Sequence, residues 1–209
     1  MKPGSFITFE GIEGAGKSCN ISHAGMLLEN SAKQVMLTRE PGGTPLGESL
    51  RELLLGHKHD DISSTAELLL MFAARAQHLQ SKILPALERG EWVICDRFTD
   101  ATYAYQGGGR NLDTAAIAAL ESLVQGERRP DLTILLDLPV SMGLERAGKR
   151  SAPDRFEREK HDFFERVRSA YLQIAERDPQ RVKVVDASVP LQQVQQQIER
   201  VLSAFLESA

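Results

Sequence analysis

A glycine-rich segment near the N-terminus constrains the fold of this chain more than any other feature of its sequence. Residues 11–18, Gly-Ile-Glu-Gly-Ala-Gly-Lys-Ser, match the pattern G-x-x-x-x-G-K-[ST] in full. A β-rich run over 5–10 precedes the segment, and a run with apolar residues at helical spacing over 17–29 follows it. Between a strand and a helix, such glycines let successive backbone N–H groups surround an anion beside the positive end of the helix. The segment therefore predicts a phosphate-binding loop; the alternative is a glycine-rich turn.

The chemistry expected of this loop is the binding of a nucleoside triphosphate. Lys17 is expected to reach the β- and γ-phosphates, and the Ser18 hydroxyl to ligate Mg²⁺. The residues expected around the triphosphate are Gly11, Ile12, Glu13, Gly14, Ala15, Gly16, Lys17 and Ser18. The strings Asn-Lys-x-Asp and Asp-x-x-Gly of regulatory GTPases do not occur in the sequence, and its length argues against a large ATPase motor. A small-molecule kinase would need a second pocket and cations around the transferred group.

Strand-like and helix-like runs alternate along the rest of the chain. Four more strands are expected at 34–38, 92–95, 132–138 and 181–185. Helices are expected at about 17–29, 46–56, 64–87, 113–125, 155–177 and 191–205, with a short one after Leu138. This order predicts an α/β fold, a five-stranded parallel sheet flanked by helices, in one domain over residues 1–209. Ligands of such sheets bind beyond the carboxyl ends of the strands.

Composition excludes several classes of partner. Lys and Arg total 25 against 29 Asp and Glu, so the formal charge is −4, which argues against nucleic acid or an anionic membrane as a partner. The longest uncharged apolar block, Leu68–Ala74, is far shorter than the ~20 residues of a membrane helix. Cys19 and Cys95 lie far apart without a CxxC motif, and the five histidines form no metal-binding pattern, so none receives a function. These features predict a cytoplasmic protein without a disulfide or a zinc site.

Charged clusters follow two of the expected strands. Arg39-Glu40-Pro41-Gly42-Gly43-Thr44 follows the second strand, and Asp96-Arg97 follows the third. An arginine at this edge can contact a phosphate with two N–H groups, and a carboxylate can hold a Mg²⁺-bound water or orient an arginine. The alternative for both clusters is a surface ion pair.

Two further groups suit a nucleotide. Phe72 and Arg75 share one face of an expected helix, and an aromatic plane beside a guanidinium suits a flat base with a carbonyl; alternatively Phe72 belongs to the core and Arg75 to the surface. Thr102, Tyr105 and Gln106 precede three glycines, and their side chains can address a base edge and a sugar. Taken alone, these polar residues give only a weak signal.

A basic stretch separates two of the expected helices. Arg146, Lys149 and Arg150 are followed by Asp154-Arg155-Phe156-Glu157. The segment at about 146–157 is expected to form a lid that closes over phosphates. The alternative is a solvated charged segment.

Together these motifs make the chain resemble the bacterial thymidylate kinases over about residues 5–206. The motifs that carry the resemblance occur in the family's order: Phe-Glu-Gly-Ile-Glu-Gly-Ala-Gly-Lys, Thr-Arg-Glu-Pro-Gly-Gly-Thr, Phe-Ala-Ala-Arg, Cys-Asp-Arg-Phe, Ala-Tyr-Gln-Gly-Gly-Gly-Arg and Asp-Arg-Phe-Glu. The resemblance implies the nucleoside monophosphate kinase fold of the P-loop NTPases and a homodimer. It also implies transfer of the γ-phosphoryl group of ATP to dTMP with Mg²⁺, giving ADP and dTDP. The alternatives are a kinase for another nucleotide or deoxynucleoside, and a protein that binds ATP without turnover.

The resemblance also implies a function for individual residues. Phe72 would stack on thymine, Arg75 would donate to a thymine carbonyl, Thr102 and Gln106 would address the base edge, and Tyr105 would lie against the deoxyribose. The monophosphate and the transferred group would be held by Arg39, Arg51 and Arg97. Glu13 would lie near the sugar or the metal, and Asp96 near Mg²⁺.

One branch of this family carries its extra catalytic cation in the P-loop, where this chain has the uncharged Ala15. The basic lid is expected to supply that cation instead, with Arg150 as the main candidate. Gly148 stands where relatives often have another arginine, and Cys19, which replaces the usual threonine, is expected to pack beneath the loop. The expected catalytic residues are Lys17, Arg97, Arg150 and Glu13.

Overall fold

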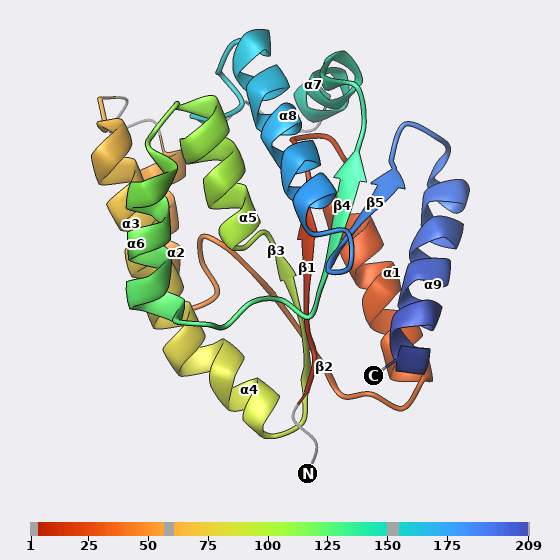
Figure 1. Ribbon diagram of the computed structural model, residues 1–209. Helices are drawn as coiled ribbons and strands as arrows, with labels where there is room; N and C mark the ends of the chain where they lie inside the picture. The colour runs from red at the N-terminus through yellow and green to blue at the C-terminus, as the bar shows by residue number, and fades with distance from the viewer. Residues whose placement is uncertain (1–3, 57–60, 150–154, 209) are drawn as a thin grey trace.

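The computed structural model describes residues 4–56, 61–149 and 155–208, and its centre is one parallel sheet between helices (Figure 1). The strands are β1 (Phe6–Glu10), β2 (Val35–Arg39), β3 (Trp92–Asp96), β4 (Leu132–Asp137) and β5 (Val182–Asp186). They are hydrogen-bonded in the order β2-β3-β1-β4-β5, with β1 in the middle. The predicted five-stranded parallel sheet is therefore confirmed.

The helices cover the sheet from two sides. They are α1 (Lys17–Asn30), α2 (Pro45–Leu55), α3 (Ser64–His78), α4 (Leu84–Glu88), α5 (Thr99–Thr102), α6 (Thr114–Gln125), α7 (Val140–Gly148), α8 (His161–Arg177) and α9 (Leu191–Ser208). Two π-helical segments, η2 (Leu79–Ile83) and η3 (Tyr103–Gly109), continue α3 and α5. In Figure 1, α1 and α9 lie together on one side of the sheet, and α3, α4 and α6 lie on the other.

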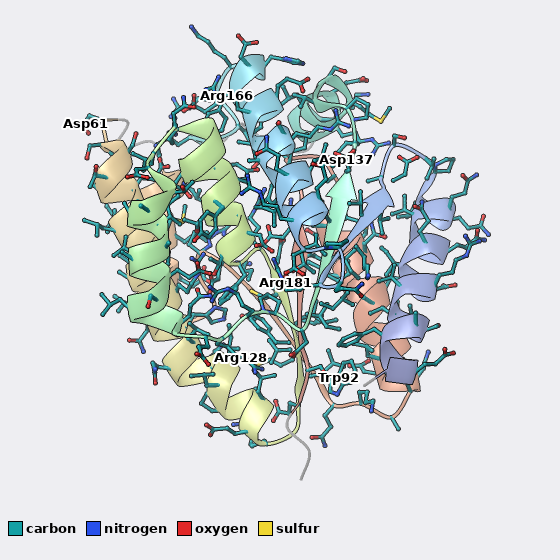
Figure 2. The ribbon with its side chains drawn as sticks, in the orientation of Figure 1. Asp61, Trp92, Arg128, Asp137, Arg166 and Arg181 are labelled. Atoms are coloured by element: carbon teal, nitrogen blue, oxygen red, sulfur yellow. The ribbon has the colours of Figure 1, made fainter. Side chains whose placement is uncertain are left out.

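The parallel strands bring their carboxyl ends to one edge. Figure 2 shows Asp137 at this edge, at the end of β4, whereas Arg181, just before β5, lies at the opposite edge. All five residues of β1 are buried, because helices cover both of its faces. The loop after β1 and the residues after β3 therefore meet at the carboxyl edge, above a closely packed core.

The helical segment over 99–109 was not expected from the sequence, because its triple glycine disfavours a helix. Packing against α8 explains the glycines. A Cβ at Gly108 would lie 2.7 Å from the Cβ of Ala170, and one at Gly109 would lie 2.5 Å from the ring of Phe163. Tertiary contact thus determines this element. α8 itself starts at His161, later than the expected position near 155.

The phosphate-binding loop packs directly on α7. Gly14 has φ +73°, and a Cβ there would lie 1.9 Å from the carbonyl oxygen of Gly143. In return, a Cβ at Gly143 would lie 2.6 Å from the carbonyl oxygen of Glu13. The close approach of the two backbones requires glycine on both sides.

Among the described residues, no helix is both long enough and apolar enough to cross a membrane.

This packing predicts opposite effects of two substitutions in α7. Gly143→Ala should destabilise the protein by about 1–3 kcal/mol and lower Tm by several degrees, because the added methyl group pushes against the loop backbone. Gly148→Ala is the matched control, since a Cβ there meets no described atom within 4 Å and alanine favours helix. Thermal unfolding of both variants tests the prediction, and equal Tm values would contradict it.

Candidate active site

A cavity of about 210 Å³ opens at the carboxyl edge of the sheet. Its walls come from the loop after β1, the segment after β2, α2, α3, the end of β3 and η3. Most of the residues predicted from the sequence line it: Glu13, Gly14, Gly16, Lys17, Ser18, Arg51, Arg75, Asp96, Arg97, Thr102, Tyr105 and Gln106. Residues absent from the predicted site also line it: Glu40, Pro41, Leu55, Met71, Phe98, Ala101, Phe156 and Glu157.

Lys17 is the first residue of α1 and covers the loop that precedes it. Its Nζ donates to the carbonyl oxygens of Gly11 at 3.0 Å and Ile12 at 3.1 Å. Removal of the ammonium group from bulk water, together with the positive charge of Arg97, lowers the pKa of Lys17 to about 8. The side chains of Ile12 and Ala15 are buried in the core, so these residues can offer an anion only their backbone.

Arg97 is fixed at the end of β3 by its backbone and by its side chain. Its φ of +69° lies in the left-handed region, and its backbone N–H donates to the carbonyl oxygen of Phe9 at 2.9 Å. The guanidinium donates to Glu13 Oε1 at 2.9 Å and to the Tyr171 hydroxyl at 3.2 Å. It also lies 4.7 Å from the centre of the Tyr105 ring. The cation is thus held in place before any substrate enters.

A buried carboxyl group, Glu10, supports this arrangement from below. Its Oε1 accepts from the backbone N–H of Phe98 at 2.7 Å, and its Oε2 accepts from the Tyr171 hydroxyl at 2.7 Å. Burial, with a further contribution from Asp100, raises the pKa of Glu10 to about 8. No motif in the sequence indicated a function for Glu10 or Tyr171, because neither belongs to the phosphate-binding loop.

Arg75 is a buried arginine held by three hydrogen bonds. Its Nε donates to Glu40 Oε2 at 2.8 Å, and its Nη2 donates to the Phe98 carbonyl at 3.1 Å and to Thr102 Oγ1 at 3.0 Å. Its Nη1 is buried and has no hydrogen-bond partner in the described part of the chain. Because Arg75 lines the cavity, Nη1 is the donor that a bound ligand can satisfy. Arg75 is therefore not the surface charge considered as an alternative.

Phe72 does not lie where the resemblance implied. Its side chain is 2% exposed and packs in a core cluster with Leu68 and Ile117, and it does not line the cavity. Met71, the preceding residue, lines the cavity instead. The expectation that Phe72 stacks on a base is corrected accordingly. Helical spacing placed Phe72 beside Arg75 but did not determine which side of α3 faces α6.

Arg39 is also outside the cavity. Its exposed side chain pairs with Glu48 at 2.9 Å on the outer side of the edge strand β2. Side chains alternate in direction along a strand, so Glu40 takes the inward position that was expected for Arg39. Arg51 does line the cavity, and its Nη1 donates to the Pro41 carbonyl at 2.9 Å. Arg39 therefore does not line the cavity in this structure, and its contact with a phosphate stays a prediction.

Tyr105 and Gln106 of η3 and Thr102 at the end of α5 also line the cavity, and each is held by a hydrogen bond. The Tyr105 hydroxyl donates to Glu13 Oε2 at 2.7 Å, and Gln106 Nε2 donates to Glu67 Oε1 at 2.8 Å. Thr102 accepts from Arg75, as described above. Glu67 is buried on α3, so it anchors Gln106 from behind the cavity wall.

The basic stretch is only partly described. Arg150, with the following residues to 154, lies outside the described residues, so its predicted catalytic position is not tested. Arg146 donates to the Ala187 carbonyl at 2.9 Å, and Lys149 pairs with Glu145 at 2.6 Å; neither lines the cavity. At the far end of the stretch, Arg155 donates to the Leu54 carbonyl at 2.8 Å. Phe156 and Glu157, which follow Arg155, line the cavity.

The donors suited to a divalent cation are few. Asp96 Oδ1 is buried and has no hydrogen-bond partner among the described residues, and Asp96 and Ser18 line the same cavity. In the described part of the chain, no group of three or more His, Cys, Asp or Glu residues is arranged to hold a metal. This set fits Mg²⁺, which proteins bind through one or two side chains together with substrate phosphates and waters.

Cys19 is exposed, so it does not pack beneath the loop as expected.

Comparison with known proteins agrees with this geometry. A family model described as thymidylate kinase matches residues 9–198. The chain is 58% identical over 199 residues to a thymidylate kinase of Alcanivorax borkumensis, covering 95% of this chain and 96% of that protein. It is 58% identical over 202 residues to a thymidylate kinase of Pseudomonas putida, covering 97% and 98%. The crystal structure of thymidylate kinase from Ehrlichia chaffeensis aligns with a TM-score of 0.78 at 36% identity, covering 96% of this chain and 99% of that one.

The lowered pKa of Lys17 predicts an alkaline loss of triphosphate affinity. In the free protein, kcat/KM for ATP should fall as pH rises above about 8, because the neutral amine attracts phosphate poorly. Bound phosphates favour the charged amine and raise its pKa, so kcat at saturating ATP should decline only at higher pH. Steady-state kinetics from about pH 6.5 to about pH 10 measure both profiles. In Lys17→Arg, ATP titrations should lack this alkaline loss, and the same midpoint in both proteins would contradict the assignment.

Proposed function

The chain belongs to the thymidylate kinase family, and we propose that the cavity at the carboxyl edge of its sheet is where it transfers the γ-phosphoryl group of ATP to dTMP. The protein is a nucleoside monophosphate kinase that forms dTDP. A kinase for another nucleotide is not favoured, because relatives at 54–58% identity over nearly the whole chain are thymidylate kinases.

The observation that carries the proposed site is the unsatisfied Nη1 of Arg75, in the same cavity as Lys17. A buried donor without a partner is costly unless a ligand satisfies it. A carbonyl of thymine is a suitable acceptor, and Thr102 and Gln106 line the same cavity and can complete the recognition of the base edge. Met71 supplies the apolar contact with the base that the sequence assigned to Phe72. Tyr105 lies against the deoxyribose.

The phosphates bind between two groups of cations. Arg51 and Arg97 hold the monophosphate of dTMP, and Lys17 and the backbone N–H groups of its loop hold the phosphates of ATP. Asp96 and Ser18 would hold Mg²⁺, which neutralises charge on the phosphoryl oxygens when bound. The attacking phosphate oxygen is already an anion, so the reaction needs positioning and charge neutralisation rather than a strong base.

Two further parts of the proposal concern the surroundings of the site. Glu13 fixes the orientation of Arg97 and Tyr105 by accepting hydrogen bonds from both. The segment at about 146–157 acts as a lid on a single domain, with Arg150 supplying the remaining catalytic cation. Phe156 and Glu157 support this proposal, because they line the cavity at the C-terminal end of the segment.

An assay of ADP release tests the proposed site, with dTMP, dUMP, dCMP, dGMP and AMP as acceptors. The assay compares the wild type with Met71→Ala. The wild type should strongly prefer dTMP. Met71→Ala should raise KM for dTMP about three- to tenfold with little change in kcat, because an apolar contact made equally in the ground and transition states is lost.

Phe72→Leu is the matched control for this assay. It should lower the stability by about 1–2 kcal/mol through a core cavity. Because the Phe72 ring lies 4.9 Å from the Arg75 guanidinium, a small rise of KM for dTMP is expected, below that of Met71→Ala. A larger effect of Phe72→Leu than of Met71→Ala on KM would return the base contact to Phe72. Absence of a preference for dTMP would contradict the proposed substrate site.

We further propose that the protein acts as a homodimer in the cytoplasm. Leu68–Ala74, the uncharged apolar block of α3, divides between two sides of the helix, since Leu68 is buried and Leu69 is exposed. Exposed leucines on neighbouring helices extend the outer face: Leu46 and Leu53 on α2, Leu69 on α3 and Leu123 on α6, 39–80% exposed. Figure 1 shows these helices together on one side of the molecule. An apolar face of this kind favours association with a second copy.

Sedimentation at micromolar concentration tests the homodimer. The wild type should sediment as a dimer, and Leu69→Glu should shift it to the monomer, because a charge would be buried at the interface. Leu191→Glu changes a similarly exposed leucine at the start of α9 and should leave the dimer intact. A monomeric wild type, or equal effects of the two variants, would contradict the proposed interface.

A further inference from the structure

We propose that His78 is a positioning residue for recognition of the base: it fixes the Glu40 carboxylate, which in turn fixes the guanidinium of Arg75. The inference rests on the proposed contact between Arg75 and the base. It assigns a function to one of the histidines for which the sequence pattern indicated none.

The three side chains form a chain of contacts beneath the cavity. Arg75 and His78 are one helical turn apart on α3, and each binds a different oxygen of Glu40. The distance from Arg75 Nε to Oε2 is 2.8 Å, and that from His78 Nδ1 to Oε1 is 3.0 Å. All three residues are nearly or fully buried, with exposed fractions of 2%, 0% and 5% for Arg75, His78 and Glu40. A carboxylate bound at both oxygens cannot rotate freely, so His78 determines where Glu40 holds Arg75.

The other ring nitrogen of His78 is also engaged. Its Nε2 lies 2.7 Å from Thr38 Oγ1 on β2. An ionised carboxylate only accepts hydrogen bonds, so Nδ1 carries the proton that faces Glu40, and in the neutral ring Nε2 accepts from the Thr38 hydroxyl. The Glu40 carboxylate thereby selects the tautomer that donates to it, and the Thr38 hydroxyl satisfies the other ring nitrogen.

The loop after β2 is shaped around this pair. Gly43 has φ +78°, and a Cβ there would lie 2.5 Å from His78 Nε2 and 2.8 Å from Thr38 Oγ1. The backbone therefore passes directly over the histidine, which explains a glycine in the segment Glu40-Pro41-Gly42-Gly43-Thr44. The same loop also offers the Pro41 carbonyl to Arg51. The loop thus links Arg75, which is proposed to bind the base, to Arg51, which is proposed to bind the monophosphate.

Loss of the contact between His78 and Glu40 has a specific kinetic consequence. Glu40 Oε1 would lose its contact with His78 Nδ1, and the carboxylate and Arg75 could then reorient together. The contact of Arg75 with the base is made equally in the ground state and the transition state. Its displacement therefore raises KM for dTMP without lowering kcat.

Two substitutions of His78 separate its two contacts. The amide nitrogen of Asn can occupy the place of Nδ1 and donate to Glu40, whereas the amide of Gln extends to the place of Nε2 near Thr38. We expect His78→Gln to raise KM for dTMP about tenfold, the effect of losing a hydrogen bond to a charged group. We expect His78→Asn to stay within about threefold of the wild type, and KM for ATP and kcat to stay within about twofold in both variants. An equal rise of KM for dTMP in both variants, or an equal rise of KM for ATP, would overturn the proposal.

Leu79→Ala controls for a general loss of stability. Leu79 is the next residue along the chain, is 1% exposed, and packs in a separate cluster with Phe6 and Ile83. The variant should lower Tm while KM for dTMP stays unchanged, because Leu79 belongs to that apolar cluster and not to the hydrogen bonds that join His78, Glu40 and Arg75. A rise of KM in Leu79→Ala as large as that in His78→Gln would make the effect of His78 merely structural.

A double-mutant cycle with Arg75→Lys distinguishes failure of this inference from failure of the proposed site. Lysine keeps the charge but lacks the Nη1 donor, so it should raise KM for dTMP by itself. If His78 acts through Arg75, adding His78→Gln to Arg75→Lys should raise KM little further, and independent multiplication of the two effects would overturn the proposal. If Arg75→Lys leaves KM unchanged, the proposed base contact is wrong and this inference is wrong with it. If only His78→Gln is silent, the base contact stands and the function of His78 is wrong.

Discussion

The ion pair between Arg97 and Glu13 joins the end of β3 to the loop after β1, and the rest of the site is built around it. Both groups are largely withdrawn from water, so each would be costly without the other. The hydroxyls of Tyr105 and Tyr171 extend the pair to η3 and α8, and Glu10 connects Tyr171 to the sheet. Because these contacts exist before substrate binds, the cation needs little reorganisation when phosphates arrive.

A protein with a net charge of −4 can bind polyanionic substrates because its cations are gathered and oriented locally. Lys17, Arg51, Arg75 and Arg97 all line one cavity. Each is restrained by a neighbour: Lys17 by loop carbonyls, Arg51 by the Pro41 carbonyl, Arg75 by the buried Glu40 carboxylate and Arg97 by the partly buried Glu13 carboxylate. Such restraint reduces the entropy lost on binding and makes the geometry of each donor specific.

Close backbone approaches hold the elements that carry these groups. Gly14 and Gly143 allow the phosphate-binding loop to rest on α7, and Gly108 and Gly109 allow η3 to rest on α8. Gly43 allows the loop after β2 to cover His78. In each case a methyl group would collide with backbone or with a side chain that is itself fixed, so the glycines specify distances between elements rather than flexibility.

The sequence by itself determined the five strands and most of the helices along the chain, the phosphate-binding loop, and the residues at the ends of β1 and β3, because these features depend on periodicity and motif spacing within one segment. Through the resemblance, it also pointed to four residues that line the cavity: Arg75, Thr102, Tyr105 and Gln106. Only the tertiary structure decided which side of each element faces the cavity. Arg39 turns outward while Glu40 turns inward, and Phe72 enters the core while Met71 lines the cavity. Local periodicity fixes directions only relative to the element itself, whereas the packing of distant segments, as of His78 against Thr38 and Glu40, fixes them in space.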